Sequence, residues 1–265
     1  ASAMKENLAG IEDYTRIATH LQPEQIVKYG ELTLRENQIA YADPGFFRLF
    51  DFELLKGDKK TCLSMPRQVV ITERIARKYF IDEYPIVKIL IFTGMYDKVS
   101  CEVTGVMKEM PSNSHIHYNF LISYASLPQY MQEYWYKHEA YTYVLLDSPE
   151  RKAEIEKEFP VMAEKYKTEE ALKNKTWGVS LIPLADIHLT PQIGYETETK
   201  GNRSAMIALI FAAVAILVIA WINYINLTVA RSMERAKEVG VRRVVGAFPK
   251  QLIYQFLFEA LVMNL

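Results

Sequence analysis

An unbroken apolar stretch, AMIALIFAAVAILVIAWI, runs from Ala205 to Ile222 inside an uncharged window that extends from Ser204 to Ala230. At about 1.5 Å of rise per residue, a helix of this stretch would reach roughly 27 Å, close to the ~30 Å hydrocarbon thickness of a bilayer. Helices of soluble proteins rarely stay apolar on every face over about five turns, so a buried core helix is the weaker interpretation. The sequence therefore predicts a transmembrane helix over residues 204–230.

The basic residues that follow this helix predict its orientation. Six of the 31 Lys and Arg residues lie after Ser204, against three of the 32 Asp and Glu residues. These six are Arg231, Arg235, Lys237, Arg242, Arg243 and Lys250. Because positive charge close to a membrane helix resists translocation, we expect the C-terminal side to be cytoplasmic. Residues 1–203 are then expected in the periplasm or outside the cell.

The segment after the helix has an amphipathic pattern, two glycines and a proline in addition to its positive charge. If residues 231–247 are helical, their apolar residues gather toward one side, as in an amphipathic helix lying under the membrane. A cluster that only fixes topology would need the basic residues but not Gly240, Gly246 and Pro249. We expect an elbow in which Gly246 ends one helix and Pro249 begins the next. Residues 231–250 are therefore predicted to be a cytoplasmic coupling segment.

The apolar residues 251–265 are interpreted as the start of a further transmembrane helix that is cut short. Both ends of the chain look cut, so we expect an earlier export helix and later membrane helices outside this sequence. Within residues 204–230, Ala208, Ala212 and Ala215 form a small-residue stripe that continues to Asn226. Small residues let helix backbones approach, and an amide in lipid needs a partner. These four residues are the predicted sites of membrane-helix packing.

Residues 1–203 mix strand and helix patterns without regular alternation, which predicts an α+β domain. The patterns indicate helices over residues 6–21, 73–80 and 151–166, the second capped by Thr72 and the third kinked or broken by Pro160. Residues 87–92 and 98–106 are expected to form a hairpin. Residues 177–189 are expected to add one or two strands, and an aromatic, helical piece includes Tyr130, Tyr134 and Trp135.

Motifs for catalysis are missing from the sequence, so no catalytic residue is predicted and the chain is not expected to be an enzyme. Gly246 is followed by Ala-Phe-Pro-Lys and not by the end of a phosphate-binding loop, which excludes ATP hydrolysis by this chain. The spacing of His115 and His117 would suit a metal on a strand, but no third ligand is evident. Asp186 and His188 could form a catalytic pair, but the sequence places no serine or cysteine nucleophile to act with them. We predict no metal, no cofactor and no nucleic-acid partner.

Two cysteines, Cys62 and Cys101, would lie in an oxidising compartment under this topology. A disulfide between them is one interpretation. The favoured interpretation is that both cysteines are small, buried hydrophobic side chains. Two thiols are too few for a disulfide-stabilised scaffold, and Cys101 lies in a strand-like alternation.

Several ordered blocks resemble a known family. The stretch NYINLTVARSMERAKEVGVRRVVGAFPKQLIYQFLFEALV is similar to the FtsX-like ABC transporter permease signature, through Arg235–Arg243, Gly246-Ala247 and Gln255–Ala260. The blocks YADPGFFRLFDFELLKGD, VVITERIARKYF, EVTGVMKEMPSNSH and LIPLADIHL resemble, in order, those of a MacB-like periplasmic core domain. The resemblance implies a porter-like α+β part, a β-rich insertion and a place in the bacterial cytoplasmic (inner) membrane.

The resemblance also implies function and partners. It implies a permease subunit that transmits the motion of an ABC ATPase to the extracytoplasmic domain, for export or envelope remodelling. Docking of the ATPase would fall to Arg235, Glu238, Arg242 and Arg243. Implied partners are the ATPase subunit, a second permease copy, membrane lipid and an envelope protein. The alternative is a single-pass extracytoplasmic sensor or ligand-binding receptor.

Overall fold

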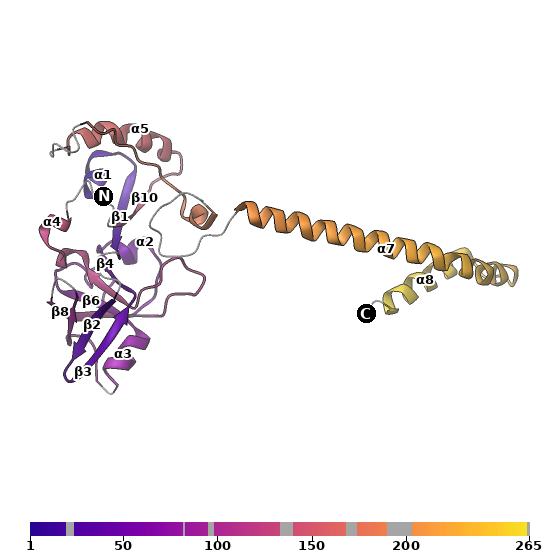
Figure 1. Ribbon diagram of the computed structural model, residues 1–265, viewed down its shortest axis with the longest axis horizontal. Helices are drawn as coiled ribbons and strands as arrows, with labels where there is room; N and C mark the ends of the chain where they lie inside the picture. The colour runs from indigo at the N-terminus through magenta and orange to yellow at the C-terminus, as the bar shows by residue number, and fades with distance from the viewer. Residues whose placement is uncertain are drawn as a thin grey trace. The chain divides into compact units, whose positions relative to one another are not determined.

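The computed structural model describes residues 1–19, 24–81, 83–94, 98–132, 140–167, 174–189 and 203–263. The chain divides into two compact units, an N-terminal unit (Ala1–Pro183) and a C-terminal unit (Leu184–Leu265). Figure 1 shows the strands in the first unit and one very long helix in the second.

The N-terminal unit contains ten strands between Ile11 and Leu146 in the described residues. They are β1 (Ile11–Ala18), β2 (Glu24–Tyr29), β3 (Leu32–Asn37), β4 (Ile39–Ala42), β5 (Leu54–Lys56), β6 (Gln68–Thr72), β7 (Ile89–Thr93), β8 (Lys98–Met107), β9 (Phe120–Ser123) and β10 (Tyr141–Leu146). The helices of this unit are α1 (Ser2–Asn7), α2 (Phe46–Leu49), α3 (Glu73–Tyr79), the 3-10 helix η1 (Tyr124–Ser126), α4 (Gln129–Gln132) and α5 (Arg151–Glu164). The C-terminal unit contains the 3-10 helix η2 (Leu184–Leu189), α7 (Arg203–Val244) and α8 (Pro249–Met263).

All the strands in the described residues join one mixed sheet in the order β10-β1-β4-β9-β6-β8-β7-β2-β3, with β5 paired to β8. The β4–β9 and β6–β8 pairs are parallel, and the other pairs are antiparallel. This arrangement confirms the predicted α+β class. The strands are hydrogen-bonded in one sheet, so a porter-like part and a β-rich insertion do not correspond to separate sheets.

The two largest apolar cores of the N-terminal unit are distinct clusters. One gathers α3 with residues of β2, β6, β7 and β8, including Val27, Ile75 and Phe92. The other gathers α2 with residues of β1, β4 and the segment before β6, including Phe46 and Leu63. The α1 and α5 helices pack together over a smaller cluster. In Figure 1 these two helices lie at the opposite end of the unit from α3.

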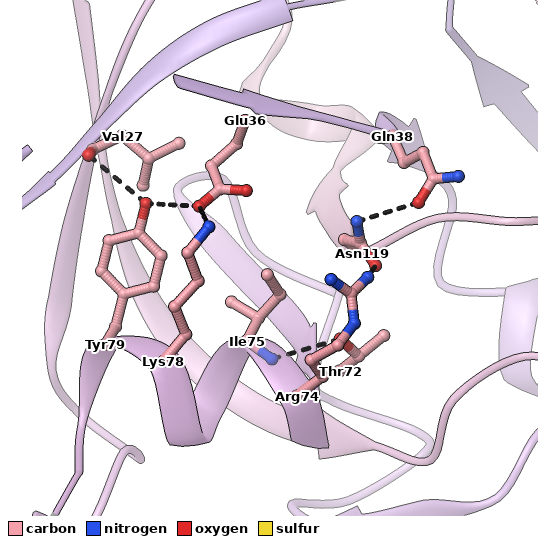
Figure 2. A network of polar contacts seen from close by, with 9 residues as sticks. All are labelled: Val27, Glu36, Gln38, Thr72, Arg74, Ile75, Lys78, Tyr79 and Asn119. Atoms are coloured by element: carbon pink, nitrogen blue, oxygen red, sulfur yellow. Dashed lines mark hydrogen bonds and ion pairs between the residues drawn. The ribbon is translucent and has the colours of Figure 1, made fainter. Parts of the chain in front are cut away.

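Polar contacts at the end of α3 tie this helix to β3 (Figure 2). The buried Glu36 carboxylate accepts hydrogen bonds from Tyr79 Oη at 2.8 Å and Lys78 Nζ at 2.6 Å. Burial, followed by the nearby Glu36 carboxylate, raises the pKa of Tyr79. The phenol therefore stays protonated and donates, so the buried carboxylate keeps its partners.

A second polar contact joins the start of α3 to the corner between β3 and β4. The Arg74 guanidinium donates to Asn119 Oδ1 at 2.6 Å, and Asn119 Nδ2 donates to Gln38 Oε1 at 2.9 Å (Figure 2). Gln38 has a φ of 58° and is the single residue between the two strands. Since a non-glycine residue rarely adopts this conformation, we infer that the Asn119 clamp holds the corner in place.

The Asp-Pro-Gly turn after β4 is locked to β1 by a nearly buried ion pair. The Arg16 guanidinium donates to both carboxylate oxygens of Asp43, at 2.7 and 2.9 Å, and the Arg16 backbone N–H adds a bond of 2.9 Å. Arg16 also donates to Gln132 O at 2.8 Å and stacks on the Tyr124 ring at 3.9 Å. One guanidinium therefore joins β1, the turn, η1 and α4.

Several sequence predictions are confirmed. Thr72 Oγ1 caps α3 by accepting from Ile75 N at 3.4 Å, and Ile75, Ala76 and Tyr79 are buried. The β7–β8 hairpin forms as expected, with Cys101 and Val103 facing the core. The charged helix also forms as α5, but Pro160 lies inside it and does not end it.

Two predictions of secondary structure are wrong. The helix expected over residues 6–21 is absent from the part of this range that the structure describes, residues 6–19: α1 ends at Asn7, Gly10 takes a φ of 88°, and β1 follows. This segment forms a strand and not a helix because β10 and β4 pair with it on its two sides. Residues 177–183 and η2 form no strand; the Leu181 N–H donates to Glu156 Oε1 at 2.7 Å, so this segment packs on α5 instead.

Candidate functional site

The α7 helix is one uninterrupted helix of 42 residues, as Figure 1 shows. At 1.5 Å per residue it is roughly 63 Å long. Its segment Ser204–Ser232 has a mean hydropathy of 3.0 in its most apolar window, and none of that window is buried in the structure. In the described chain it is the one helix long and apolar enough to cross a membrane. Its exposed apolar surface needs lipid or other membrane helices around it.

The predicted helix-packing residues lie within this spanning segment. Ala208, Ala212, Ala215 and Asn226 are all exposed in the structure. Their role in helix packing therefore stays a prediction. The Thr228 hydroxyl is different, because it donates to Tyr224 O at 2.8 Å within the helix and needs no partner from another helix.

The helix does not stop where the apolar segment Ser204–Ser232 ends. Residues 231–247 were expected to be helical if they form an amphipathic helix under the membrane, and they continue α7 as far as Val244. Their position relative to the membrane stays a prediction. The residues after Ser232 include Met, Glu, Arg, Ala and Lys, which favour helix, and a single glycine at Gly240 costs only about 1 kcal/mol. The residues after Ser232 are therefore an extension of the long apolar helix, and this extension ends in an elbow.

The elbow forms at the predicted residues. Gly246 has a φ of 100°, its N–H donates to Arg243 O at 3.1 Å, and the Ala247 N–H donates to Arg242 O at 3.0 Å. These two bonds define a Schellman motif, which satisfies the last carbonyls of a helix. Pro249 is the first residue of α8, a position where its missing N–H and restricted φ are favourable.

The predicted docking residues differ in their surroundings. Arg242 forms an ion pair with Glu238 one turn earlier and donates to Gln255 Oε1 of α8 at 3.2 Å. Arg243 is exposed, and the side chain of Arg235 lies outside the described residues. Sequence reasoning missed Gln255, because no local pattern signals a contact across the elbow. The Glu238–Arg242–Gln255 contact joins α7 to α8, so two of the four residues have a structural role at the elbow.

The other residues weighed for chemistry do not assemble a site in the described part of the chain. His115 Nε2 lies 3.1 Å from Tyr143 Oη, and His117 Nε2 lies 3.0 Å from Pro111 O. No group of three or more metal-ligating side chains occurs among the residues that the structure covers. Asp186 lies in η2, and the side chain of His188 is outside the described residues.

The two cysteines are free and buried, and they belong to different apolar clusters. Burial raises the pKa of each thiol to about 12. Because the thiolate is the reactive form, we expect neither Cys62 nor Cys101 to react with a maleimide at pH 7.5 in the folded protein. Both should react after unfolding in guanidinium, as counted by mass spectrometry. A disulfide under non-reducing conditions, or labelling of the folded protein within minutes, would contradict this placement.

A mixed α/β unit followed by one helix long and apolar enough to cross a membrane is the layout of a membrane protein with a domain outside the bilayer. The model of the MacB-like periplasmic core domain family matches residues 1–160, and that of the FtsX-like permease C-terminal family matches residues 210–265. The chain therefore belongs to the FtsX-like ABC transporter permeases with a MacB-like periplasmic core domain. The family is one of transporters.

Individual relatives agree with this membership. The macrolide export ATP-binding/permease protein MacB of Rhodopseudomonas palustris is 28% identical over 203 residues, which cover 75% of this chain and 28% of that protein. MacB of Escherichia coli K12 is 34% identical over 70 residues, or 26% of this chain and 11% of that protein. The chain thus spans only about a quarter of the length of the first relative.

A solved structure supports the fold. The crystal structure of a domain of a protein described as a permease, from Porphyromonas gingivalis, matches with a TM-score of 0.54 at 22% identity. The match covers 64% of this chain and 71% of that one. At this identity the likeness concerns the fold of the N-terminal unit alone.

Proposed function

We propose that this chain is part of a permease of the bacterial inner membrane that transmits the motion of a cytoplasmic ABC ATPase to its extracytoplasmic domain. The work done outside the membrane would be export or envelope remodelling. The observation that carries the proposal is the continuity of α7, which runs from Arg203 through the spanning segment to Val244 without a break. Because α7 is unbroken over this length, a push at the elbow would be passed along the helix toward its other end.

We propose that the ATPase lies outside residues 1–265. The chain has no phosphate-binding loop, whereas its MacB relatives are named as combined ATP-binding and permease proteins. We propose that residues 231–250 dock on such an ATPase, fused or separate. A second permease copy would pack against the stripe formed by Ala208, Ala212, Ala215 and Asn226, with lipid on the remaining faces. An envelope protein would contact the N-terminal unit.

Charge reversal at the elbow tests this function. We expect the double substitution Arg242→Glu and Arg243→Glu to reduce the permease-dependent stimulation of ATP hydrolysis at least about tenfold, because it places acidic groups beside Glu238 and removes two cations. The measurement is ATP hydrolysis by the full-length permease and its ATPase in nanodiscs.

The matched control is Arg242→Lys with Arg243→Lys, which keeps the positive charge and should retain most of the stimulation. The thermal unfolding of the N-terminal unit should be the same in both double variants. Unchanged stimulation in the charge-reversal variant would contradict the docking role of this segment.

The alternative, a single-pass sensor or receptor, would continue into a cytoplasmic signalling domain after the helix. The chain instead turns at the elbow into α8, and residues 210–265 match a permease family. These two observations favour the permease.

A further inference from the structure

The segment that joins α3 to β7 exposes several large apolar side chains of the N-terminal unit. Ile81, Tyr84, Val87 and Ile89 are 82%, 61%, 68% and 55% exposed, and all four lie within residues 81–89. Apolar groups gathered on a surface in water mark a contact with another molecule, whereas single exposed residues need no explanation. The segment lies outside the apolar helix Ser204–Ser232, so the lipid hydrocarbon around that helix does not account for it.

Val87 adopts a backbone conformation that is unfavourable for valine. Its φ is 65°, and the Lys88 N–H donates to Pro85 O at 3.2 Å, so Val87 is the third residue of a β-turn. Glycine or asparagine is favoured at such a position, because a β-branched residue is strained there. The exposed Val87 side chain gains little packing within its own chain to offset this strain. Strained residues of this kind gather at functional sites.

Three of these side chains follow one edge of β8 in order. Ile89 pairs with β8 in the β7–β8 hairpin, and the Val87 N–H donates at 2.9 Å to the next residue of β8. Tyr84 lies further along, because Lys56 of β5 has its Nζ atom 4.5 Å from the centroid of the Tyr84 ring, and β5 pairs with the end of β8. The exposed side chains Tyr84, Val87 and Ile89, together called the turn patch, therefore form one row.

The two ends of the turn patch carry opposite charges. Lys56 lies at the Tyr84 end, and Glu102 lies opposite Ile89 at the other end; both are exposed. Glu102 and the β8 residue that pairs with Lys56 are four positions apart, which is about 13 Å along a strand. In the described part of the chain, neither Lys56 nor Glu102 forms an ion pair. Each is therefore available to a charge on a partner.

This pattern is complementary to itself. If a second copy is turned by 180° about an axis through Val87, its Glu102 faces Lys56 of the first copy, and the reverse pair forms at the other end. The apolar side chains then meet between the two ion pairs, with Val87 of each copy at the centre. A partner surface of one charge sign would suit only one end of the turn patch.

We propose that the turn patch is the surface through which two copies of this permease pair their extracytoplasmic domains. The inference deepens the proposed function, which pairs two copies through the membrane helix, and it rests on that function. Tyr84, Val87 and Ile89 supply the apolar contact, and Lys56 and Glu102 set its register. A small patch is sufficient, because two copies held in one complex meet at a high effective concentration.

A single cysteine on the proposed axis tests the contact. In the full-length permease in bacterial membranes, Val87→Cys is expected to form a disulfide-linked dimer after mild oxidation, because a residue on a twofold axis meets its own copy. The native Cys62 and Cys101 are buried and should not link. Val161→Cys on α5, at a position that is 74% exposed, is the matched control and should run as a monomer on a non-reducing gel. A monomeric Val87→Cys variant, or equal linkage from both positions, would overturn the inference.

Charge exchange tests the register independently. In the Val87→Cys background, Lys56→Glu is expected to lower the linked fraction at least about fivefold, because it places two carboxylates against each other, and Glu102→Lys should do the same with two cations. When one chain carries Lys56→Glu and a differently tagged chain carries Glu102→Lys, the two should link to each other at nearly the original level. A folding defect in either chain cannot produce this rescue. Linkage that stays low in the mixed pair would overturn the proposed register.

The two proposals fail in different ways. Ala212→Cys lies in the stripe through which the membrane helices of two copies are proposed to pack. If Ala212→Cys links and Val87→Cys does not, the copies pair in the membrane and the turn patch is not their contact. If neither variant links, the proposed pairing of two copies is wrong as well. Linkage at position 87 together with rescue in the mixed pair supports the turn patch.

Discussion

Replacing Gly45 with alanine is expected to prevent the N-terminal unit from folding. A Cβ atom at this position would lie 2.0 Å from the backbone oxygen of Tyr14. That oxygen cannot move away easily, because Tyr14 is paired with Val144 in the sheet. A clash with fixed backbone should cost more than about 4 kcal/mol, which is a large part of the stability of a domain.

Circular dichroism and soluble yield of the N-terminal unit, produced alone, measure this effect. Gly178→Ala is the matched control, because nothing lies within 4 Å of its Cβ and its φ is ordinary. The control should fold like the unmodified unit. A Gly45→Ala variant with an unchanged melting temperature would show that the turn is placed incorrectly.

Removing the Asp43 carboxylate is expected to destabilise the N-terminal unit by about 3–5 kcal/mol. The change Asp43→Ala leaves the Arg16 guanidinium, whose side chain is only 17% exposed, without its acidic partner. Breaking a buried ion pair on one side costs this much because the remaining charge is left uncompensated. In a domain of this size the melting temperature should fall by about 10 °C.

The control for the loss of an acid is Asp51→Ala. Asp51 is fully exposed and pairs with Lys59 at 3.6 Å, so its loss should hardly change the melting temperature. Equal melting temperatures for Asp43→Ala and the unmodified unit would contradict the Arg16–Asp43 lock.

The features that sequence predicted correctly depend on short-range signals. Thr72 before an apolar-periodic run marks the start of α3, and the alternation of Cys101 and Val103 marks a half-buried strand. Gly246 and Pro249 mark the elbow, because each has a local conformational reason to be there. None of these requires knowledge of a distant partner.

The features that sequence did not predict depend on distant partners. Ile11 lies in a strand because Leu146, far along the chain, pairs with it. Its own segment fits a helix equally well by periodicity. The contact between Arg242 and Gln255 exists only once α8 turns back at the elbow. The predicted docking residues were selected by their charge. Charge alone does not distinguish the Glu238–Arg242 ion pair, which contributes to the structure of the elbow, from the exposed Arg243.

The most direct test of the whole account is the side of the membrane on which each end of the spanning helix lies. Single cysteines are placed at Lys157 in the N-terminal unit and at Lys237 beyond the spanning segment, both exposed. The native thiols are buried and should not contribute to labelling. In spheroplasts, a membrane-impermeant maleimide should label the cysteine at position 157 at once, and the one at position 237 only after the membrane is permeabilised. Labelling of both cysteines in intact spheroplasts would contradict the account.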